Sequence, residues 1–278
     1  MDAAMFDRIP FNLLTNVPNN AVSVTALRQA GPIIMSVSKD GPMAISKLSC
    51  QRSGTAKVEL ILQDGSGPGI PLMNSPCHID AILGSGQKPY ILPQPLFLDE
   101  NHVLNAFFSD LSGETNTIRI NAGGARFLKD LQDPDGKLAR ERMLRRQYVS
   151  MPYFYTTYNG PVVLAAPAAS AGNGIFEIAA NAWFEIHQIS YVATSPLFNI
   201  DLYNQATGES LINAPGGQHY KIPARLMLGD NNFPFKLHEP WMIGPGQKLI
   251  AEMTNDSGAE NTVHLVLGGI WYRTGDLR

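Results

Sequence analysis

The chain has 278 residues, of which only 16% are charged, and its formal net charge is −3; an average soluble domain has roughly 25% charged residues. The small negative charge excludes a global basic field of the kind that drives nucleic-acid binding, and no apolar run approaches the roughly 18 residues of a membrane-spanning helix. Because residues 1–10 lack a basic segment followed by an apolar one, no signal peptide is expected, and the protein should be made in the cytoplasm and stay soluble or join an assembly.

The first half of the chain contains both cysteines, Cys50 and Cys77. They form neither a metal-ligand spacing nor a Cys-x-x-Cys pair. One interpretation is a disulfide between the two strands that carry them. The other, which we favour, is two buried thiols in a reducing cytoplasm.

Two strands are predicted near the end of the first half. Val103–Phe108 and Thr117–Ile120 are rich in aliphatic, aromatic and β-branched residues, and Gly123-Gly124 is predicted to end the second strand. Between them, Ser112-Gly113 and Asn116-Thr117 form a Ser-Gly-x-x-Asn-Thr motif whose glycine favours positive φ and whose asparagine favours a side-chain bond to its own turn. We predict a hairpin.

A helix is predicted at residues 135–149, because this stretch has no proline and no glycine after Gly136 and is rich in good helix formers. It would link two domains. Its arginines either contact nucleic acid or an acidic neighbour, or form a solvated face, which is the interpretation that we favour. These arginines are Arg140, Arg142, Arg145 and Arg146.

The second half shows the same strand patterns. In the run 183–189, alternation places Phe184 and Ile186 on one face and Glu185 and His187 on the other. A second hairpin is predicted from 248–253 and 262–267, ended by a second glycine pair. The turn motif that precedes its last strand consists of Ser257, Gly258, Asn261 and Thr262.

The two halves are copies of one unit. Residues 84–124 match residues 229–269 at a constant shift of 145, with 12 identities in 41 ungapped positions, against about two or three expected by chance. A gapped match extends upstream, where Asn74-Ser75-Pro76 resembles Asn213-Ala214-Pro215. Short strands at regular spacing with turns between them indicate a sandwich or jelly roll.

The predicted fold is therefore all-β: two tandem, internally duplicated antiparallel β-sandwich domains of jelly-roll type, joined by a short helix. The first domain, with an N-terminal arm, spans 1–127, the linker helix 128–150 and the second domain 151–278.

The sequence offers no catalytic constellation. None of the six histidines has a second histidine at i+2, i+3 or i+4, and there is no Gly-x-Ser-x-Gly elbow, so we expect neither a metal, nor a cofactor, nor an enzyme. A glycosidase would need two carboxylates across a cleft. The candidates in the second copy are Glu185, Asp201, Glu209 and Glu239, each of which is more typical of a strand edge or turn.

Aromatic side chains of the second copy allow another hypothesis. Tyr158, Trp183 and Trp241 could stack on sugar rings, as in carbohydrate-binding modules. Their apolar neighbours favour packing in the core or at an interface instead.

The order of motifs in the second copy resembles small β-rich virion proteins found among the structural genes of tailed bacteriophages. The resemblance covers most of 152–273 and, more weakly, 84–127. The motifs that carry it are Pro152–Tyr155, Trp183–Ile186, Phe198–Leu202, Asn213–Pro215, Pro234, Leu237–Pro240, Asn255–Gly258 and Gly268-Gly269.

This resemblance implies a virion component made in the host cytoplasm: a head decoration or minor capsid protein, or a tail accessory protein. Its partners would be other virion proteins, such as the major capsid or tail proteins, and further copies of itself. The motifs are turn and strand residues, so no binding residue can be carried over. The alternative is a carbohydrate- or receptor-binding module of a phage tail.

Overall fold

The computed structural model describes residues 8–14, 22–24, 29–37, 42–52, 58–65, 69–110, 116–127, 149–166, 169–211, 220–230 and 233–273. The chain forms two compact units, and the second includes a short segment that interrupts the sequence of the first. Unit 1 comprises Met1–Met73 and Leu83–Pro152, and unit 2 comprises Asn74–Ile82 and Tyr153–Arg278. The predicted linker helix and its four arginines, at 128–148, lie outside the described residues.

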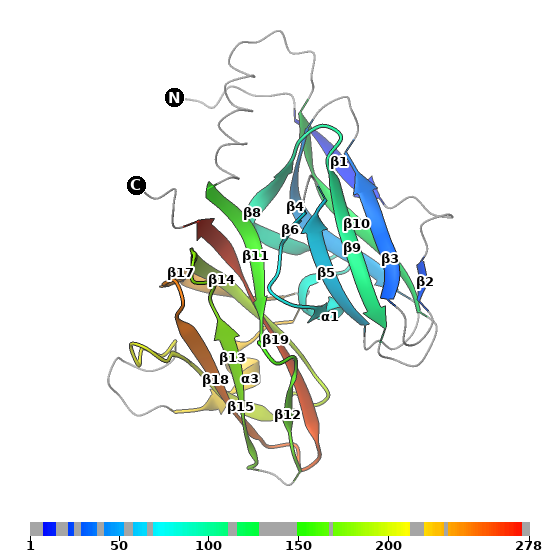
Figure 1. Cartoon of the computed structure of the whole chain (residues 1–278). Helices are drawn as coiled ribbons and strands as arrows, with labels where there is room; N and C mark the ends of the chain where they lie inside the picture. Colours follow the sequence, from blue (N-terminus) through cyan, green and yellow to red (C-terminus); the bar gives the residue numbers. More distant parts are fainter. Residues whose placement is uncertain are drawn as a thin grey trace. The chain divides into compact units, whose positions relative to one another are not determined.

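Unit 1 is a β-sandwich of two antiparallel sheets (Figure 1). One sheet has the strand order β1-β10-β4-β8, with β2 added on β10, and the other has the order β3-β9-β5-β6. The strands are β1 (Arg8–Leu14), β2 (Val22–Val24), β3 (Gln29–Ser36), β4 (Met43–Arg52), β5 (Val58–Asp64), β6 (Ile70–Pro71), β8 (Tyr90–Leu98), β9 (Val103–Asp110) and β10 (Asn116–Phe127).

Unit 2 repeats this arrangement. Its sheets have the orders β11-β19-β14-β17, with β12 added on β19, and β13-β18-β15-β16. The elements are β7 (Cys77–His78), α1 (Ile79–Ile82), β11 (Ser150–Thr156), β12 (Val162–Leu164), β13 (Ala171–Glu177), β14 (Ala182–Ala193), β15 (Phe198–Asn204), β16 (Ile222–Pro223), α3 (Ala224–Met227), β17 (Phe235–Ile243), β18 (Lys248–Asn255) and β19 (Asn261–Arg273).

In both units the chain crosses between the two sheets in the same sequence, so that strands distant along the chain become neighbours. Two facing four-strand paths with this repeated crossing make a jelly roll. The prediction of an all-β chain with two duplicated, jelly-roll-type sandwiches is confirmed. Within the described residues, no helix is long and apolar enough to cross a membrane.

Each sandwich has a core built by strand alternation. In β14, Phe184 and Ile186 are fully buried in the core cluster of unit 2, whereas Glu185 and His187 are partly exposed, as the alternation predicts. Burying one such apolar side chain contributes roughly 1.5–3 kcal/mol. Cys50, half-buried in unit 1, and Cys77, buried in unit 2, do not form a disulfide.

The glycine pairs do not end their strands, contrary to prediction. β10 continues through Gly123-Gly124 and β19 through Gly268-Gly269, and at each pair the facing strand carries a bulge, at Ser46 in β4 and His187 in β14. A Cβ added to Gly124 or Gly269 would overlap a carbonyl oxygen of that facing strand. Glycine is therefore needed here because two backbones approach closely.

The predicted hairpins are also wrong. β9 pairs with β3 and β5, whereas β10 pairs with β1 and β4; likewise β18 and β19 belong to opposite sheets of unit 2. The repeated Ser-Gly-x-x-Asn-Thr motif thus connects the two layers of the sandwich. Turn chemistry marks a reversal of the chain, but the sheet that each strand joins is decided by partners elsewhere in the sequence.

Buried tyrosines in unit 2 give a pH-dependent prediction. Burial raises the pKa of Tyr155, whose hydroxyl oxygen accepts a hydrogen bond from the Ala179 amide, and burial also raises the pKa of Tyr153. Unfolding returns both groups to a pKa of about 10. Their contribution to stability is therefore complete below about pH 10 and is lost as the pH rises toward the folded pKa values.

We expect tyrosinate absorbance to show two of the nine tyrosines ionising only as the protein unfolds. Tyr155→Phe should reduce the alkaline loss of stability. Normal ionisation of all nine in the folded protein would contradict this.

Candidate functional site

The junction that precedes β8 and β17 is built the same way in both copies. At the shift of 145, α1 corresponds to α3 and Gly84 to Gly229. Gly84 forms a parallel bridge with Ser49, and Gly229 forms one with Ser190. The carbonyls of both glycines accept a strand amide at 2.8 and 2.9 Å, respectively. The duplication therefore extends to individual hydrogen bonds.

The two copies of this junction differ strongly in exposure. Ala81 of α1 is fully buried, whereas its counterpart in α3, Leu226, is 72% exposed. Phe233 is 61% exposed, and its counterpart in the first copy is the exposed Lys88. With Phe235, these residues form the α3 surface: Leu226, Phe233 and Phe235. Leu226 and Phe235 line one hollow, and Phe233 lies two residues before Phe235. Exposed apolar side chains that gather in this way mark interaction sites.

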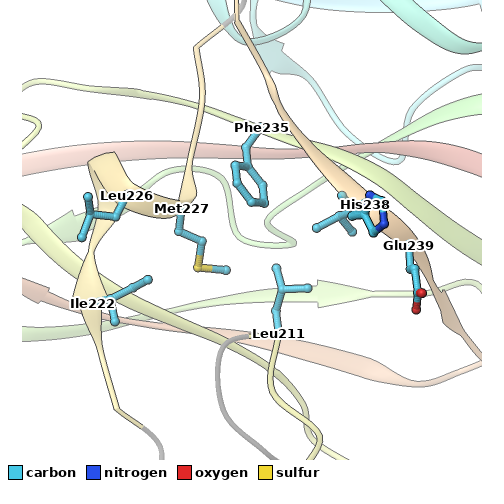
Figure 2. A pocket seen from close by; sticks show the side chains of 8 residues that line it. Leu211, Ile222, Leu226, Met227, Phe235, His238 and Glu239 are labelled. Carbon is cyan, nitrogen blue, oxygen red and sulfur yellow. The ribbon is translucent and has the colours of Figure 1, made fainter.

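A hollow of about 350 Å³ lies beside the α3 surface. Met227, Phe235 and Leu211 point toward one another across it (Figure 2). Its other apolar walls are Ile222, Leu226 and Leu237, and His238 and Glu239 are its polar lining. This composition suits the insertion of an apolar side chain more than a chemical reaction.

Part of this hollow is formed by a bulge of β17, a segment that does not pair with β14. Lys236 pairs with Gln188, and the next pair is Trp241 with Ile186, so residues 237–240 leave the ladder. The matching segment of unit 1, residues 92–95, leaves β8 between the pairs of Lys47 and Ile45. The repeated Leu-x-x-Pro pattern belongs to this bulge, since proline cannot donate to a ladder.

A second candidate site is a polar and aromatic patch on the same sheet. Tyr272 Oη donates a hydrogen bond to Glu185 Oε2 at 2.6 Å. His187 Nε2 lies 3.4 Å from the same oxygen and has no hydrogen-bond partner within the described part of the chain. Trp183, 38% exposed, lies opposite Tyr272 in the ladder. The patch therefore combines an exposed indole with a carboxylate that accepts hydrogen bonds.

The other predicted aromatic residues are not brought together with this patch. Tyr158 is 65% exposed and follows β11, where its amide donates to Ile175. Trp241 is partly buried and packs against the core cluster. Tyr158, Trp183 and Trp241 therefore do not form one stacking platform.

The four candidate carboxylates lie on different elements. Glu185 on β14 accepts a hydrogen bond from Tyr272 on the neighbouring strand β19. Asp201 is fully buried on β15 and accepts a hydrogen bond from Ser210 Oγ at 2.6 Å. Glu209 and Glu239 are exposed. These contacts are typical of carboxylates that hold strands and turns in place.

The turn motif is described in the second copy. Gly258 has a φ of +72°, as predicted for a tight connection, whereas Ser112 and Gly113 of the first copy lie outside the described residues. Asn261 does not hold its own turn, contrary to prediction. Its side chain bonds the backbone of Ser195, accepting from the amide at 2.9 Å and donating to the carbonyl at 2.8 Å.

The residue that holds the turn is Asn255, which the motif did not include. Its Oδ1 accepts hydrogen bonds from the amide and hydroxyl of Ser257 at 3.0 and 2.7 Å, and its Nδ2 donates to the carbonyl of Ala259 at 2.7 Å. Asn116 and Thr117 begin β10, as Asn261 and Thr262 begin β19.

We expect Gly258→Val to destabilise unit 2 by about 1–2 kcal/mol, because valine is strained at positive φ. Space around Gly258 is open, so only the backbone conformation opposes the substitution. Gly258→Asn is the matched control, since asparagine tolerates this conformation. The same loss is expected for Gly113→Val. Melting curves measure both, and unchanged melting temperatures in both valine variants would contradict a structural role.

The α3 surface could have been found by comparing the copies position by position. Ala81 is replaced by Leu226 and Lys88 by Phe233, so the second copy is more apolar at these two corresponding positions. Neither change alters a motif. A four-residue helix is also too short to show a periodic pattern.

No family model matches this sequence, and no curated protein matches it either. Among solved structures, the chain is similar to the tandem CBM22-1–CBM22-2 domains of Xyn10C from Paenibacillus barcinonensis. The alignment covers 91% of this chain and 86% of that chain, at 10% identity and a TM-score of 0.21. At this TM-score the likeness carries no argument about function.

Proposed function

We propose that this chain is a non-catalytic structural component of a bacteriophage virion, a capsid-associated protein that acts through protein–protein contacts. The observation that carries the proposal is the α3 surface, where Leu226 and Phe233 expose 72% and 61% of their surface beside an apolar hollow. Such a patch on a folded unit is stabilised when another protein removes it from water.

The architecture supports the same proposal. Jelly rolls recur in viral capsid proteins and in lectins, which is an argument by analogy of fold. Two jelly rolls in one chain present two similar sets of surfaces, an arrangement that suits a regular lattice. The low charged fraction, 16%, leaves more neutral surface available for burial by neighbours.

Light scattering of the purified full chain over a concentration series, with and without empty phage capsids, tests this function. We expect self-association or capsid binding through contacts that bury more than about 1,000 Å². A monodisperse monomer that leaves the capsids unlabelled would refute the proposal.

A second candidate, glycan binding at a phage tail, is favoured by one observation. Trp183 is exposed beside Glu185 and opposite Tyr272, so a stacking surface adjoins a hydrogen-bond acceptor. Titration of tryptophan fluorescence with host polysaccharide should then give a saturable change that Trp183→Ala abolishes and Trp241→Phe preserves. A flat response of the unmodified chain would eliminate this candidate.

A further inference from the structure

Unit 2 shows how one copy of the repeated helix is covered by protein. Its segment Asn74–Ile82 places α1 against β14 and β19. The carbonyl of Ala81 accepts a hydrogen bond from Ser190 Oγ at 2.6 Å, and the rings of His78 and His264 lie 5.0 Å apart. Ala81 and Ser190 are both fully buried as a result.

The face of the sheet that receives α1 is the one turned away from the core of unit 2. Val263, Leu265 and Leu267 of β19 belong to the core cluster, so the intervening Val266 points to the opposite face. Val266 is nevertheless 0% exposed. The outer face of β14 and β19 is therefore buried around Ser190 and Val266, where α1 lies.

The helix α3 occupies the corresponding place in the second copy, where its outward side chain Leu226 is exposed to solvent. Leu226, the counterpart of Ala81, is 72% exposed, although Ala224 and Met227 are buried like their counterparts Ile79 and Ile82. The inward side of the helix is thus preserved in both copies. The position that α1 uses against a sheet is, in α3, the apolar and exposed Leu226.

Unit 1 carries the repeat counterpart of the receiving sheet. The matching glycine bridges equate Ser49 of β4 with Ser190 of β14, and the shift of 145 equates Arg119 and Asn121 of β10 with His264 and Val266 of β19. Arg119 and its neighbour across the ladder, Gln51, are exposed. Because β14 and β19 already hold α1, the accessible counterpart is the exposed end of the β4–β10 face at Arg119 and Gln51; Ser49 on the same face is only 4% exposed.

We propose that the α3 surface binds a second copy of this chain, on the outer face of that copy's β4–β10 sheet. This inference rests on the proposed function, because it names the partner that the α3 surface binds. The receiving face is more polar than β14–β19, so Leu226 would pack on the aliphatic part of Arg119. Glu239, exposed beside the hollow, carries the opposite charge to Arg119.

This contact joins two different surfaces. Two copies can exchange it about a two-fold axis, or each copy can use its α3 surface on one neighbour and offer its β4–β10 face to another. The first arrangement is a dimer, and the second closes into a larger ring or continues as a chain. Such an interface would explain why the second copy has Leu226 and Phe233 where the first copy has Ala81 and Lys88.

The first experiment measures self-association of the full chain by light scattering, with Leu226→Lys compared with Val163→Lys. Val163 is 55% exposed on β12, so both substitutions add the same charge at an exposed site. We expect Leu226→Lys to weaken association at least about tenfold and Val163→Lys to leave it unchanged. If Leu226→Lys associates as the unmodified chain does, this inference fails while the proposed function stands. If the unmodified chain is a monomer and does not bind capsids, both this inference and the proposed function are refuted.

The second experiment identifies the receiving face. In a Cys50→Ser background, chains carrying Leu226→Cys are mixed with chains carrying Arg119→Cys and treated with a short bismaleimide. We expect cross-linked pairs in the mixture and few with either variant alone. Equally efficient cross-linking of Leu226→Cys alone would show that two α3 surfaces meet, and would overturn the proposal.

Discussion

Replacing Gly229 by alanine should destabilise unit 2 by about 1–3 kcal/mol or more, the range for overfilling a well-packed site. An added Cβ would overlap the carbonyl oxygen of Phe233 and the amide nitrogen of Phe235. Both are backbone atoms, so no rotamer change can relieve the overlap. The junction that leads from α3 into β17 would have to move.

Gly84→Ala should cause the same loss in unit 1, where the added Cβ would meet backbone atoms of Lys88 and Tyr90. Gly86→Ala is the matched control, since no atom lies within 4 Å of its added Cβ. Chemical denaturation of the three variants decides the matter. Equal stability of Gly229→Ala and Gly86→Ala would contradict the described junction.

Replacing Asn255 by alanine should cost about 1–3 kcal/mol, because it removes several part-buried hydrogen bonds at once. The side chain is fully buried and joins two segments: its own turn, through Ser257 and the carbonyl of Ala259, and the carbonyl of Ala165 after β12.

Asn255→Asp separates the two halves of this network. Aspartate keeps the acceptor for Ser257 but places its second carboxylate oxygen against the carbonyl oxygens of Ala165 and Ala259, so at neutral pH it should be at least as destabilised as Asn255→Ala. Asn173→Ala, at an exposed position of β13, is the control and should change stability by less than about 0.5 kcal/mol. Thermal melting in which Asn255→Ala matches Asn173→Ala would contradict the assigned role.

The sequence predicted those features of the fold that depend on local pattern or on the repeat. Alternation along β14 correctly placed Phe184 and Ile186 in the core, and the shift of 145 indicated two similar sandwiches. Features that depend on distant partners were wrong. The hairpins failed because β10 and β19 pair with β4 and β14 instead of with the strands before them.

Glycine and asparagine had the same limitation. The pair Gly268-Gly269 has the composition of a strand end, yet it lies inside β19 where β14 bulges toward it. Asn261 has the composition of a turn residue, yet it bonds a loop 66 residues away. In both cases residue type indicated a special backbone environment, and tertiary contacts decided which one.

The candidate site was outside the reach of motif analysis. Its apolar residues come from β16, α3, β17 and Leu211, and none of them lies in a repeated motif that carries chemistry. They differ from the first copy in one respect: α1 is covered by a sheet, whereas the matching side of α3 is exposed. That difference becomes visible only when the exposure of Leu226 is set beside that of Ala81.

A reconstruction by electron cryomicroscopy of phage particles, purified from the host that encodes this chain, tests the central claim most directly. We expect two jelly-roll densities per chain at regular positions of the particle, with α3 covered by protein. Complete particles that contain no density for this chain would contradict it.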